Sequence, residues 1–203
     1  MKKLAVALGF MTLSASAFAQ GTAPGNFYMG VSAGQTKVDT GIGGTTGTAS
    51  LDETDTGFKI FAGVKIDNIW SAELQYADFG KISLKGNSGD TFTYQGEQYQ
   101  FLANNAELSL KATSFGGAIV AGYDVSKVVR PFAKIGLHRW DSEASESSTA
   151  GSGSLSDSGT DIFYGVGVQF SLTNQVSVRL EAEEYKFDDE KARLVSIGFA
   201  YQF

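Results

Sequence analysis

The final stretch of the chain, Leu194-Val195-Ser196-Ile197-Gly198-Phe199-Ala200-Tyr201-Gln202-Phe203, alternates between two kinds of side chain. Large apolar residues occupy every second position, and small or polar residues lie between them. Because successive side chains of a strand point to opposite faces of a sheet, this pattern predicts a strand with one apolar face and one small, polar face. The same two-residue period recurs along most of the chain, which predicts an all-β protein.

Seven more segments share this period and are rich in aromatic and β-branched residues. The predicted strands are Asn26–Val38, Thr56–Ile66, Trp70–Phe79, Leu108–Tyr123, Arg130–Trp140, Asp161–Leu172, Gln175–Tyr185 and Leu194–Phe203. Most are about ten residues long, the length that a tilted strand needs to cross a bilayer. No segment keeps a 3.6-residue apolar stripe, so we expect almost no helix.

The connections between these segments alternate in length. The short connections are Asp67–Ile69, Asp124–Val129 and Thr173–Asn174, whereas the long polar ones are Asp39–Asp55, Gly80–Glu107 and Asp141–Thr160. A last connection, Lys186–Arg193, is short and charged. Barrels of the outer membrane have short periplasmic turns and longer extracellular loops. The sequence therefore predicts an eight-stranded antiparallel up-and-down transmembrane β-barrel.

The charged residues decide which face of each strand points inward. In Gln175–Tyr185, aliphatic residues share one face while Arg179, Glu181 and Glu183 share the other. A Lys or Arg facing lipid at mid-bilayer costs about 2–4 kcal/mol, so we expect the charged face to line the lumen, which eight strands leave just wide enough for side chains to fill. The predicted lumenal charge network is Lys59, Glu73, Lys111, Lys134, Arg179, Glu181 and Glu183. Lys111 needs a change of phase within its strand, which predicts a bulge near Ala112–Ser114.

The N-terminus has the pattern of an export signal. Lys2 and Lys3 precede a short apolar run, and Ala17-Phe18-Ala19 provides the small residues that a signal peptidase reads. The run is too short for a spanning helix, so we predict a signal peptide over residues 1–19 and an outer-membrane barrel domain over residues 20–203.

Composition excludes several classes of protein. The 203 residues are 42% hydrophobic, which is too apolar for a disordered chain. They include no Cys, so there is no disulfide framework, thiolate metal site or lipid-modified cysteine anchor. The formal net charge of −6 argues against nucleic acid as a partner, since neutralising phosphates requires a basic surface.

Several motifs resemble known outer-membrane proteins. The terminal alternation resembles the C-terminal signal that the barrel-assembly machinery reads, with the residues Val195, Ile197, Phe199, Tyr201 and Phe203. Trp70–Gly80, Arg130–Leu137 and Val178–Glu181 with Tyr185 resemble the third, fifth and seventh strands of OmpA-like transmembrane domains. The resemblance implies a barrel in the outer membrane of a Gram-negative bacterium, with a lumenal salt-bridge network that includes Glu73, Arg179 and, as a weaker match, Lys111. We expect the family's periplasmic peptidoglycan-binding domain to be absent, and the second long loop is unusually large.

No residue pattern points to a catalytic, cofactor-binding or metal site. The single histidine, His138, has no serine two residues away on its own face and lies beside Trp140, so we interpret it as a residue of the membrane interface. The acidic loop residues lack calcium-loop spacing, and the Gly/Ser/Thr tracts form no phosphate-binding motif. The expected interface aromatics are Trp70, Phe132, Trp140, Tyr164, Phe170, Tyr201 and Phe203.

Three functions fit this barrel. The first is a structural or surface-interaction role through extracellular loops, suggested by the aromatic residues Phe92, Tyr94, Tyr99 and Phe101, although these residues could equally pack the loop on itself. The second is a small channel gated by the lumenal network, and a lipid-modifying enzyme comes third. A soluble exported lipid-binding barrel is a rival to all three, but it leaves the terminal Phe203 unexplained. The expected partners are outer-membrane lipid, lipopolysaccharide, the barrel-assembly machinery and an extracellular or host ligand, for a monomeric protein.

Overall fold

The computed structural model describes residues 26–188 and 190–203, and these residues form strands, turns and loops without any helix. The predicted signal peptide lies outside the described residues. Because the described residues form no helix, none of them belongs to a helix that is long and apolar enough to cross a membrane. The strands are β1 (Phe27–Asp39), β2 (Ile42–Gly43), β3 (Ser50–Asp52), β4 (Thr54–Lys65), β5 (Trp70–Gly86), β6 (Thr91–Tyr94), β7 (Glu97–Gln100), β8 (Ala106–Gly122), β9 (Val129–Ser148), β10 (Gly151–Ser171), β11 (Val176–Phe187) and β12 (Glu190–Gln202).

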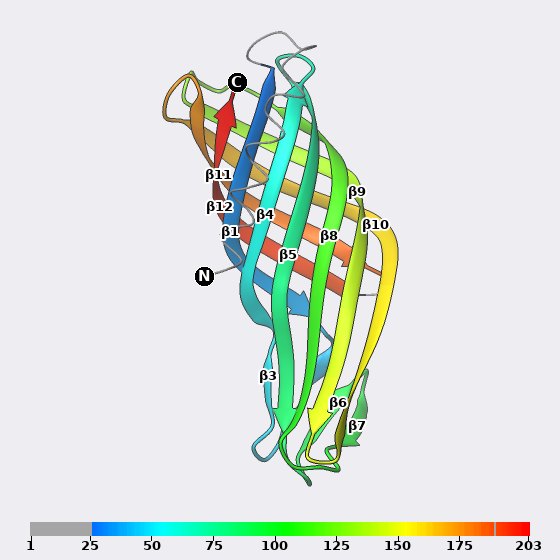
Figure 1. The fold of residues 1–203 in the computed structure, drawn as a ribbon. Helices are drawn as coiled ribbons and strands as arrows, with labels where there is room; N and C mark the ends of the chain where they lie inside the picture. Colours follow the sequence, from blue (N-terminus) through cyan, green and yellow to red (C-terminus); the bar gives the residue numbers. More distant parts are fainter. Residues whose placement is uncertain (1–25, 189) are drawn as a thin grey trace.

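Eight long strands close into an antiparallel barrel, which confirms the predicted fold (Figure 1). The order is β5-β4-β1-β12-β11-β10-β9-β8, and pairing of β8 with β5 completes the cylinder. Closure leaves no free edge around the barrel wall, as a bilayer requires, because an unpaired backbone group in hydrocarbon costs several kcal/mol. Each of the eight predicted strands has its counterpart among these eight.

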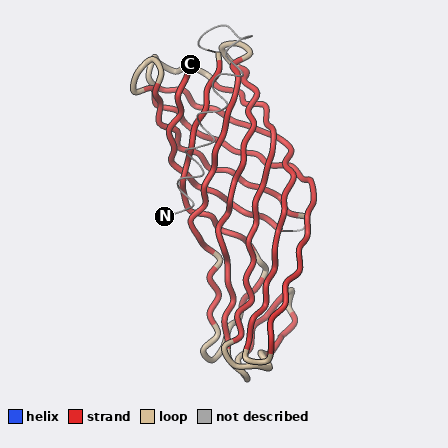
Figure 2. The backbone as a smooth tube through the Cα atoms, in the orientation of Figure 1, coloured by secondary structure: helices blue, strands red, loops and turns tan. Residues whose placement is uncertain are grey.

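The two ends of the barrel differ strongly (Figure 2). One end, which we call the turn end, carries the short connections at 66–69, 123–128 and 172–175 together with the chain's last residue. At the opposite, loop end, strands β5, β8, β9 and β10 continue far past the rest. The prediction of long loops over Gly80–Glu107 and Asp141–Thr160 is therefore partly wrong. The second of these segments, Asp141–Thr160, is almost wholly the hairpin of β9 and β10. Its Ser- and Gly-rich backbone continues the hydrogen-bonded pairing with the neighbouring strand β8.

These continuations form a structure that we call the extension. It comprises residues 81–86 of β5, 106–113 of β8, 141–148 of β9 and 151–160 of β10, with β3 paired to the tip of β5. A second, three-stranded sheet of β2, β6 and β7 belongs to it. The strands β1, β11 and β12 end well short of the tip, so the wall of the extension stands on one side of the barrel only (Figure 1).

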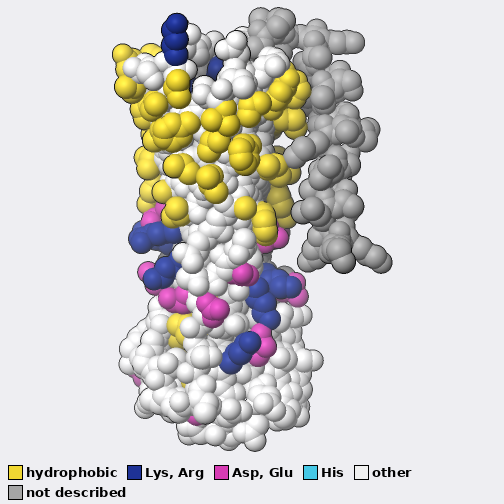
Figure 3. Space-filling view, turned by 90° about the vertical axis from the view of Figure 1, so that its left-hand side faces the viewer, with side chains coloured by type: hydrophobic (Ala, Val, Ile, Leu, Met, Phe, Trp, Pro, Cys, Tyr) yellow, Lys and Arg dark blue, Asp and Glu magenta, His cyan; other side chains and the backbone are white. Residues whose placement is uncertain are grey.

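Apolar side chains form a belt around the outside of the barrel near the turn end (Figure 3). Val166 and Val195 each expose 61% of their surface there, and Phe58 exposes 58%. Such a belt is the outward-facing band of a barrel that spans a bilayer. Of the expected interface aromatics, Trp70, Tyr164, Phe170, Tyr201 and Phe203 lie on the outer surface. Phe132 and Trp140 were predicted wrongly, since both point into the barrel and are buried.

The polarity of β8 inverts along its length without a bulge. Leu108 and Leu110 face inward, whereas Phe115 and Ile119 face outward, yet β8 pairs with β9 in one unbroken register. The predicted bulge near Ala112–Ser114 is therefore wrong. The apolar residues change sides because the outer face meets lipid in one half of the strand and water in the other. An irregularity does occur in the neighbouring strand β5, where the pairing with β8 shifts between Asp78 and Lys81.

Gly80 makes this irregularity possible. It has a φ of +77°, in the left-handed region that glycine adopts without strain. A Cβ atom here would also lie only 2.5 Å from the carboxylate of Asp55. That carboxylate accepts a hydrogen bond of 2.6 Å from the backbone N–H of Lys81, which fixes the shifted strand against β4.

The belt predicts how the barrel responds to a charge on its outer face. Val166→Arg should lower the free energy of unfolding by about 2–4 kcal/mol, because the guanidinium would face hydrocarbon near the middle of the part of β10 that lies in the belt. Ser156→Arg lies on the same face of the same strand, but within the extension, and should change stability by less than about 0.5 kcal/mol. Denaturant unfolding in phospholipid vesicles measures both values. Equal losses from the two variants would show that the belt does not face lipid.

Candidate functional site

Six of the predicted lumenal charges meet in one buried cluster. The carboxylates of Glu181 and Glu183 accept from Lys59 at 2.8 and 2.5 Å, and both also lie 2.7 Å from the ammonium of Lys134. Arg179 pairs with Glu73 at 2.8 Å and with Glu181 at 3.1 Å. No side chain of the cluster exposes more than 3% of its surface. Three cations and three carboxylates therefore balance within the lumen.

Polar and aromatic neighbours complete the cluster. The hydroxyl of Tyr28 donates to Glu73 at 3.1 Å, and that of Tyr185 donates to Glu183 at 3.0 Å. The guanidinium of Arg179 lies between the rings of Phe61 and Phe132, 4.3 and 4.5 Å from their centroids. Such cation–π contacts are strongest where water is excluded. These side chains fill the width of the lumen rather than lining a pore.

Lys111 does not belong to this cluster, and its predicted place in the lumen is wrong. It is exposed on the outer face of the extension, where β8 keeps the phase that the predicted bulge would have changed. Its cross-strand neighbours are Lys81 of β5 and Glu143 of β9. Because this part of β8 is outside the apolar belt, a lysine can face outward without meeting lipid.

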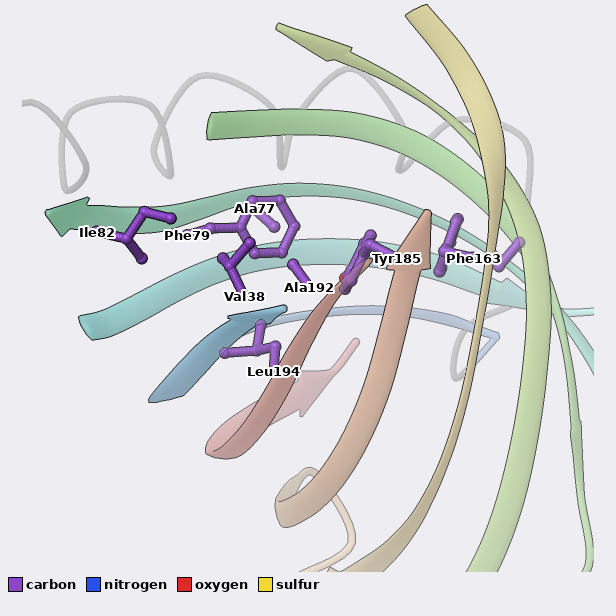
Figure 4. Close-up of a cluster of buried hydrophobic side chains, with 9 residues drawn as sticks. Val38, Ala77, Phe79, Ile82, Phe163, Tyr185, Ala192 and Leu194 are labelled. Carbon is purple, nitrogen blue, oxygen red and sulfur yellow. The ribbon is translucent and has the colours of Figure 1, made fainter. Parts of the chain in front are cut away.

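A plug of aromatic side chains lies between the charge cluster and the loop end. Phe163 and Tyr185 are completely buried and stack at 5.2 Å, and Phe79 packs edge-on to Tyr185 at 4.8 Å. Figure 4 shows these residues pointing into the barrel from different strands, together with the aliphatic side chains Val38, Ala77, Ile82, Ala192 and Leu194. Phe187 and Trp140 continue the aromatic contacts toward the mouth. The lumen is therefore closed at two levels.

His138 is part of this plug, so its interpretation as an interface residue is wrong. Its ring is 1% exposed, and its Nδ1 atom lies 2.9 Å from the hydroxyl of Ser114 on the adjacent strand. Its Nε2 atom lies 2.9 Å from the carbonyl of Lys186, so Nε2 carries the proton and Nδ1 accepts from Ser114. The sequence of the His138 strand alone does not reveal this serine, because cross-strand register brings the two residues together. Ser114 is itself 3% exposed, so the pair closes the plug rather than facing a substrate.

The tip of the extension is held by a single carboxylate. Asp90 accepts hydrogen bonds from the hydroxyl and backbone N–H of Thr48, at 2.6 and 3.1 Å, and from the backbone N–H of Asn87 at 2.8 Å. The hydrogen bond from the Thr48 hydroxyl and those from the two N–H groups lower the pKa of Asp90. Asp90 thus joins the loop before β3 to the start of the β6–β7 hairpin.

The aromatic residues of the second long loop pack largely on one another. The rings of Phe92 and Tyr99 stack at 5.6 Å, and Phe101 lies 5.3 Å from Phe92 and is buried. Tyr94 lies 6.5 Å from Tyr99, which is the most exposed of the four. The predicted hairpin exists, with a two-residue turn at Gln95-Gly96 in which both residues have positive φ. Of the two readings of these aromatics, the structure favours packing for Phe92 and Phe101.

Strand β10 has a free edge in the extension. Residues Gly151–Phe170 pair with β9, but the described pairing with β11 begins only at Phe163. Over residues 151–160 the far side of β10 therefore has no strand partner among the described residues. This edge is exposed almost throughout and consists of Gly, Ser and Thr apart from Leu155 and Asp157.

Residues 5–203 match the family described as outer membrane protein beta-barrel domain. No curated protein matches the chain. Among solved structures, the chain resembles Ail, the attachment invasion locus protein of Yersinia pestis, in its complex with the heparin analogue sucrose octasulfate. The TM-score is 0.57 and the identity 20%, over 89% of this chain and 100% of Ail.

Two further solved barrels share the fold. OprG from Pseudomonas aeruginosa gives a TM-score of 0.55 at 10% identity, over 89% of this chain and 97% of OprG. Neisserial surface protein A gives a TM-score of 0.50 at 18% identity, over 87% of this chain and 97% of that protein. At these identities the likeness concerns the fold of the barrel.

The charge cluster predicts non-additive mutations. Glu73→Gln should lower the free energy of unfolding by about 3–5 kcal/mol, because Arg179 and Lys134 then remain desolvated with too few carboxylates. Adding Arg179→Gln restores the balance of charge, so the double variant should lose less than the sum of the two single variants, by about 0.5–3 kcal/mol. Denaturant unfolding, with heat-modifiable gel migration as a check of folding, measures this coupling. Strictly additive losses would show that the two residues act independently.

Asp90 predicts a local effect. Asp90→Asn should speed amide hydrogen exchange at Thr48, Asn87 and the β6–β7 hairpin, while the barrel unfolds as before. Because the pKa of Asp90 is lowered in the folded protein, its contribution is complete above the ordinary pKa of Asp and is lost as the pH falls through the lowered value. Exchange in the unaltered protein, corrected for the intrinsic pH dependence, should approach that of the variant in acid. An identical pattern of exchange in both proteins at neutral pH would contradict this role.

Proposed function

The chain belongs to the outer membrane protein β-barrel family, and we propose that it acts as a surface-interaction protein that binds other proteins through the free edge of β10. Membership of the family places the barrel in the outer membrane. In this proposal the loop end faces the outside of the cell, so that the extension projects from the membrane toward extracellular or host partners. Lipopolysaccharide then surrounds the outer half of the apolar belt.

One observation carries the proposal: the edge of β10 is unprotected. Natural proteins blunt free edges with charged side chains, prolines, bulges or a covering segment. Residues 151–160 contain a single charged residue, Asp157, and no proline. Their small side chains leave the backbone N–H and C=O groups open to an incoming strand. Addition of an extended segment to such an edge is an established mode of protein recognition.

The extension is also stiff enough to present that edge. Cross-strand pairs join β9 and β10 from Ser148 and Gly151 down to the membrane-spanning part of the barrel. Asp90 and the packed aromatics hold the neighbouring loops in place. A preformed edge loses little conformational entropy when it binds. The name of Ail refers to attachment and invasion, and a barrel of similar fold can evidently carry such a role, but the proposal for this chain rests on its own edge.

The alternative functions have less support. A channel needs a continuous path, whereas the balanced charge cluster and the aromatic plug fill the lumen at two levels. A lipid-modifying enzyme needs a nucleophile that its substrate can reach. The Ser114–His138 pair is buried, and its imidazole is held by a backbone carbonyl, so we propose a structural role for it.

A register-preserving deletion tests the proposed edge. Ala144–Ser147 and Ser152–Leu155 form four cross-strand pairs, and removing both segments shortens the hairpin while its turn and alternation stay intact. Bacteria displaying this variant should lose their binding to cultured epithelial cells and to surfaces coated with matrix protein, because the free edge becomes too short.

The matched control keeps the edge but changes its side chains. Ser154→Ala and Ser156→Ala should bind as the unaltered protein does, since backbone groups carry the interaction. Surface display of every variant is measured with an antibody against an added tag. Unchanged binding by the shortened hairpin, or an equal loss in the alanine variants, would overturn the proposal.

A further inference from the structure

The mouth of the barrel contains two adjoining cavities. The inner cavity lies next to the aromatic plug and has a volume of about 610 Å³, and the outer cavity lies inside the extension and has a volume of about 550 Å³. Both cavities are lined by Ile82, Tyr94, Leu110 and Glu190. The walls of the outer cavity are mainly apolar, and its principal apolar residues are Ile42, Leu51, Leu84, Phe92, Leu108 and Leu155. The floor of the inner cavity includes the aromatic residues Phe79, Trp140 and Phe187. A molecule entering from the loop end therefore meets apolar walls and a closed floor.

Within the described residues, the Lys and Arg side chains around this mouth are confined to its outer face. On each strand the Lys and Arg residues alternate with inward-facing neighbours, so their side chains lie on the outer face. Those residues are Lys37, Lys81, Lys85, Lys111, Arg139, Lys186, Lys191 and Arg193. Lys191 and Arg193 border the inner cavity, but their charged groups point away from it. Both pair with Glu184 on the outer face, at 3.2 and 3.0 Å.

Carboxylates, by contrast, occur on both faces of these strands: Glu107, Glu143 and Glu184 face outward, whereas four others occupy inward positions. Asp157 and Asp161 share the face of Phe163 on β10, Glu146 shares the face of Trp140 on β9, and Glu190 shares the face of Ala192 on β12. The interior of the described mouth is thus acidic as well as apolar. Such a mouth attracts cations and repels anions, and the attraction grows where the walls exclude water.

Glu146 and Glu190 are the two carboxylates that line the apolar outer cavity. Neither carboxylate has an ion pair or hydrogen-bond partner within residues 26–188 and 190–203. Partial burial and the nearby charge of Asp39 raise the pKa of Glu190, so its ionised form is held at a cost. A bound cation would relieve that cost, and an apolar body would fill the space beside it.

We propose that the mouth binds a hydrophobic organic cation, such as an aryl-alkyl ammonium ion. The apolar part occupies the cavity walled by Leu84, Phe92 and Leu108, and the ammonium group is attracted by Glu146 and Glu190. Phe92 and Tyr94 also line this cavity, and aromatic rings attract quaternary ammonium groups. The ligand must both bury an apolar part and neutralise the carboxylates. A small inorganic cation lacks the apolar part, and an apolar anion lacks the positive charge.

The closed floor makes this a binding site rather than an entrance. On the turn-end side of Phe79 and Phe187, the plug residues Phe163 and Tyr185 are completely buried. A cation that enters the mouth is therefore retained or released on the same side. This activity is separate from the proposed edge of β10, which uses backbone groups on the rim of the extension.

Two probes with the same aryl-alkyl body and opposite charge test the proposal. Phenylbutyl-trimethylammonium and phenylvalerate have the same aryl-alkyl body, and each is titrated into the barrel in lipid nanodiscs by isothermal calorimetry, with empty nanodiscs subtracted. The ammonium ion should bind saturably and at least about tenfold more tightly than the carboxylate, because the mouth attracts one charge and repels the other. Tetramethylammonium, which has the charge without the body, should bind more weakly than the aryl-alkyl ion.

Matched variants locate the site. Glu146→Gln with Glu190→Gln should weaken binding of the ammonium probe about tenfold. Glu107→Gln with Glu143→Gln removes the same number of charges from the outer face of the extension and should leave binding unchanged. Equal binding of the two probes, uptake only in proportion to nanodisc lipid, or equal effects of the two double variants would overturn the proposal.

Discussion

The constraint on which this structure depends is the cost of charge and of unpaired backbone in hydrocarbon. It requires a closed barrel, and it requires that the ionic face of every membrane-spanning strand point inward. Once inside, the charges lose their water and must find partners. The lumen meets this need with three cations and three carboxylates in mutual contact, and it supports Arg179 between two aromatic rings. The filled lumen is therefore a consequence of closing the barrel around charges.

The same constraint explains why the strands change character at the loop end. Beyond the apolar belt, water replaces lipid outside, so the outer face becomes polar and apolar residues move inward. Strand β8 makes this change in one continuous register, from Phe115 facing out to Leu110 facing in. The extension therefore has a small apolar interior of its own, in which Phe101 and Leu84 are buried. Because the outer face of β8 meets lipid in one part and water in the other, its apolar residues face outward in the first part and inward in the second.

This inversion also marks how much could be predicted from the sequence. The alternating period predicts the eight strands. The face on which each charge lies predicts that seven residues line the lumen, and six of them do so. The prediction for Lys111 is wrong because the change of polarity along β8 reflects a change of solvent and not a change of register. The long hairpin of β9 and β10 was missed because Ser and Gly have little preference for strands, and pairing with β8 is what orders them. The Ser114–His138 contact depends on cross-strand register, which no single strand reveals.

Around the described mouth, Lys and Arg lie on the outer face only, whereas carboxylates lie on both faces. Outside, Lys and Arg lie just beyond the apolar belt, at the level where a bilayer carries its phosphate groups, and there a cation is favourable. The outward carboxylates Glu107 and Glu184 pair with these cations, whereas the inward Glu146 and Glu190 have no cation beside them among the described residues. Cations placed inward would pair with Glu146 and Glu190 and fill the cavity. The inner face of the mouth thus stays negatively charged although lysines and arginines are close in sequence, because strand alternation places neighbouring residues on opposite sides of the barrel wall.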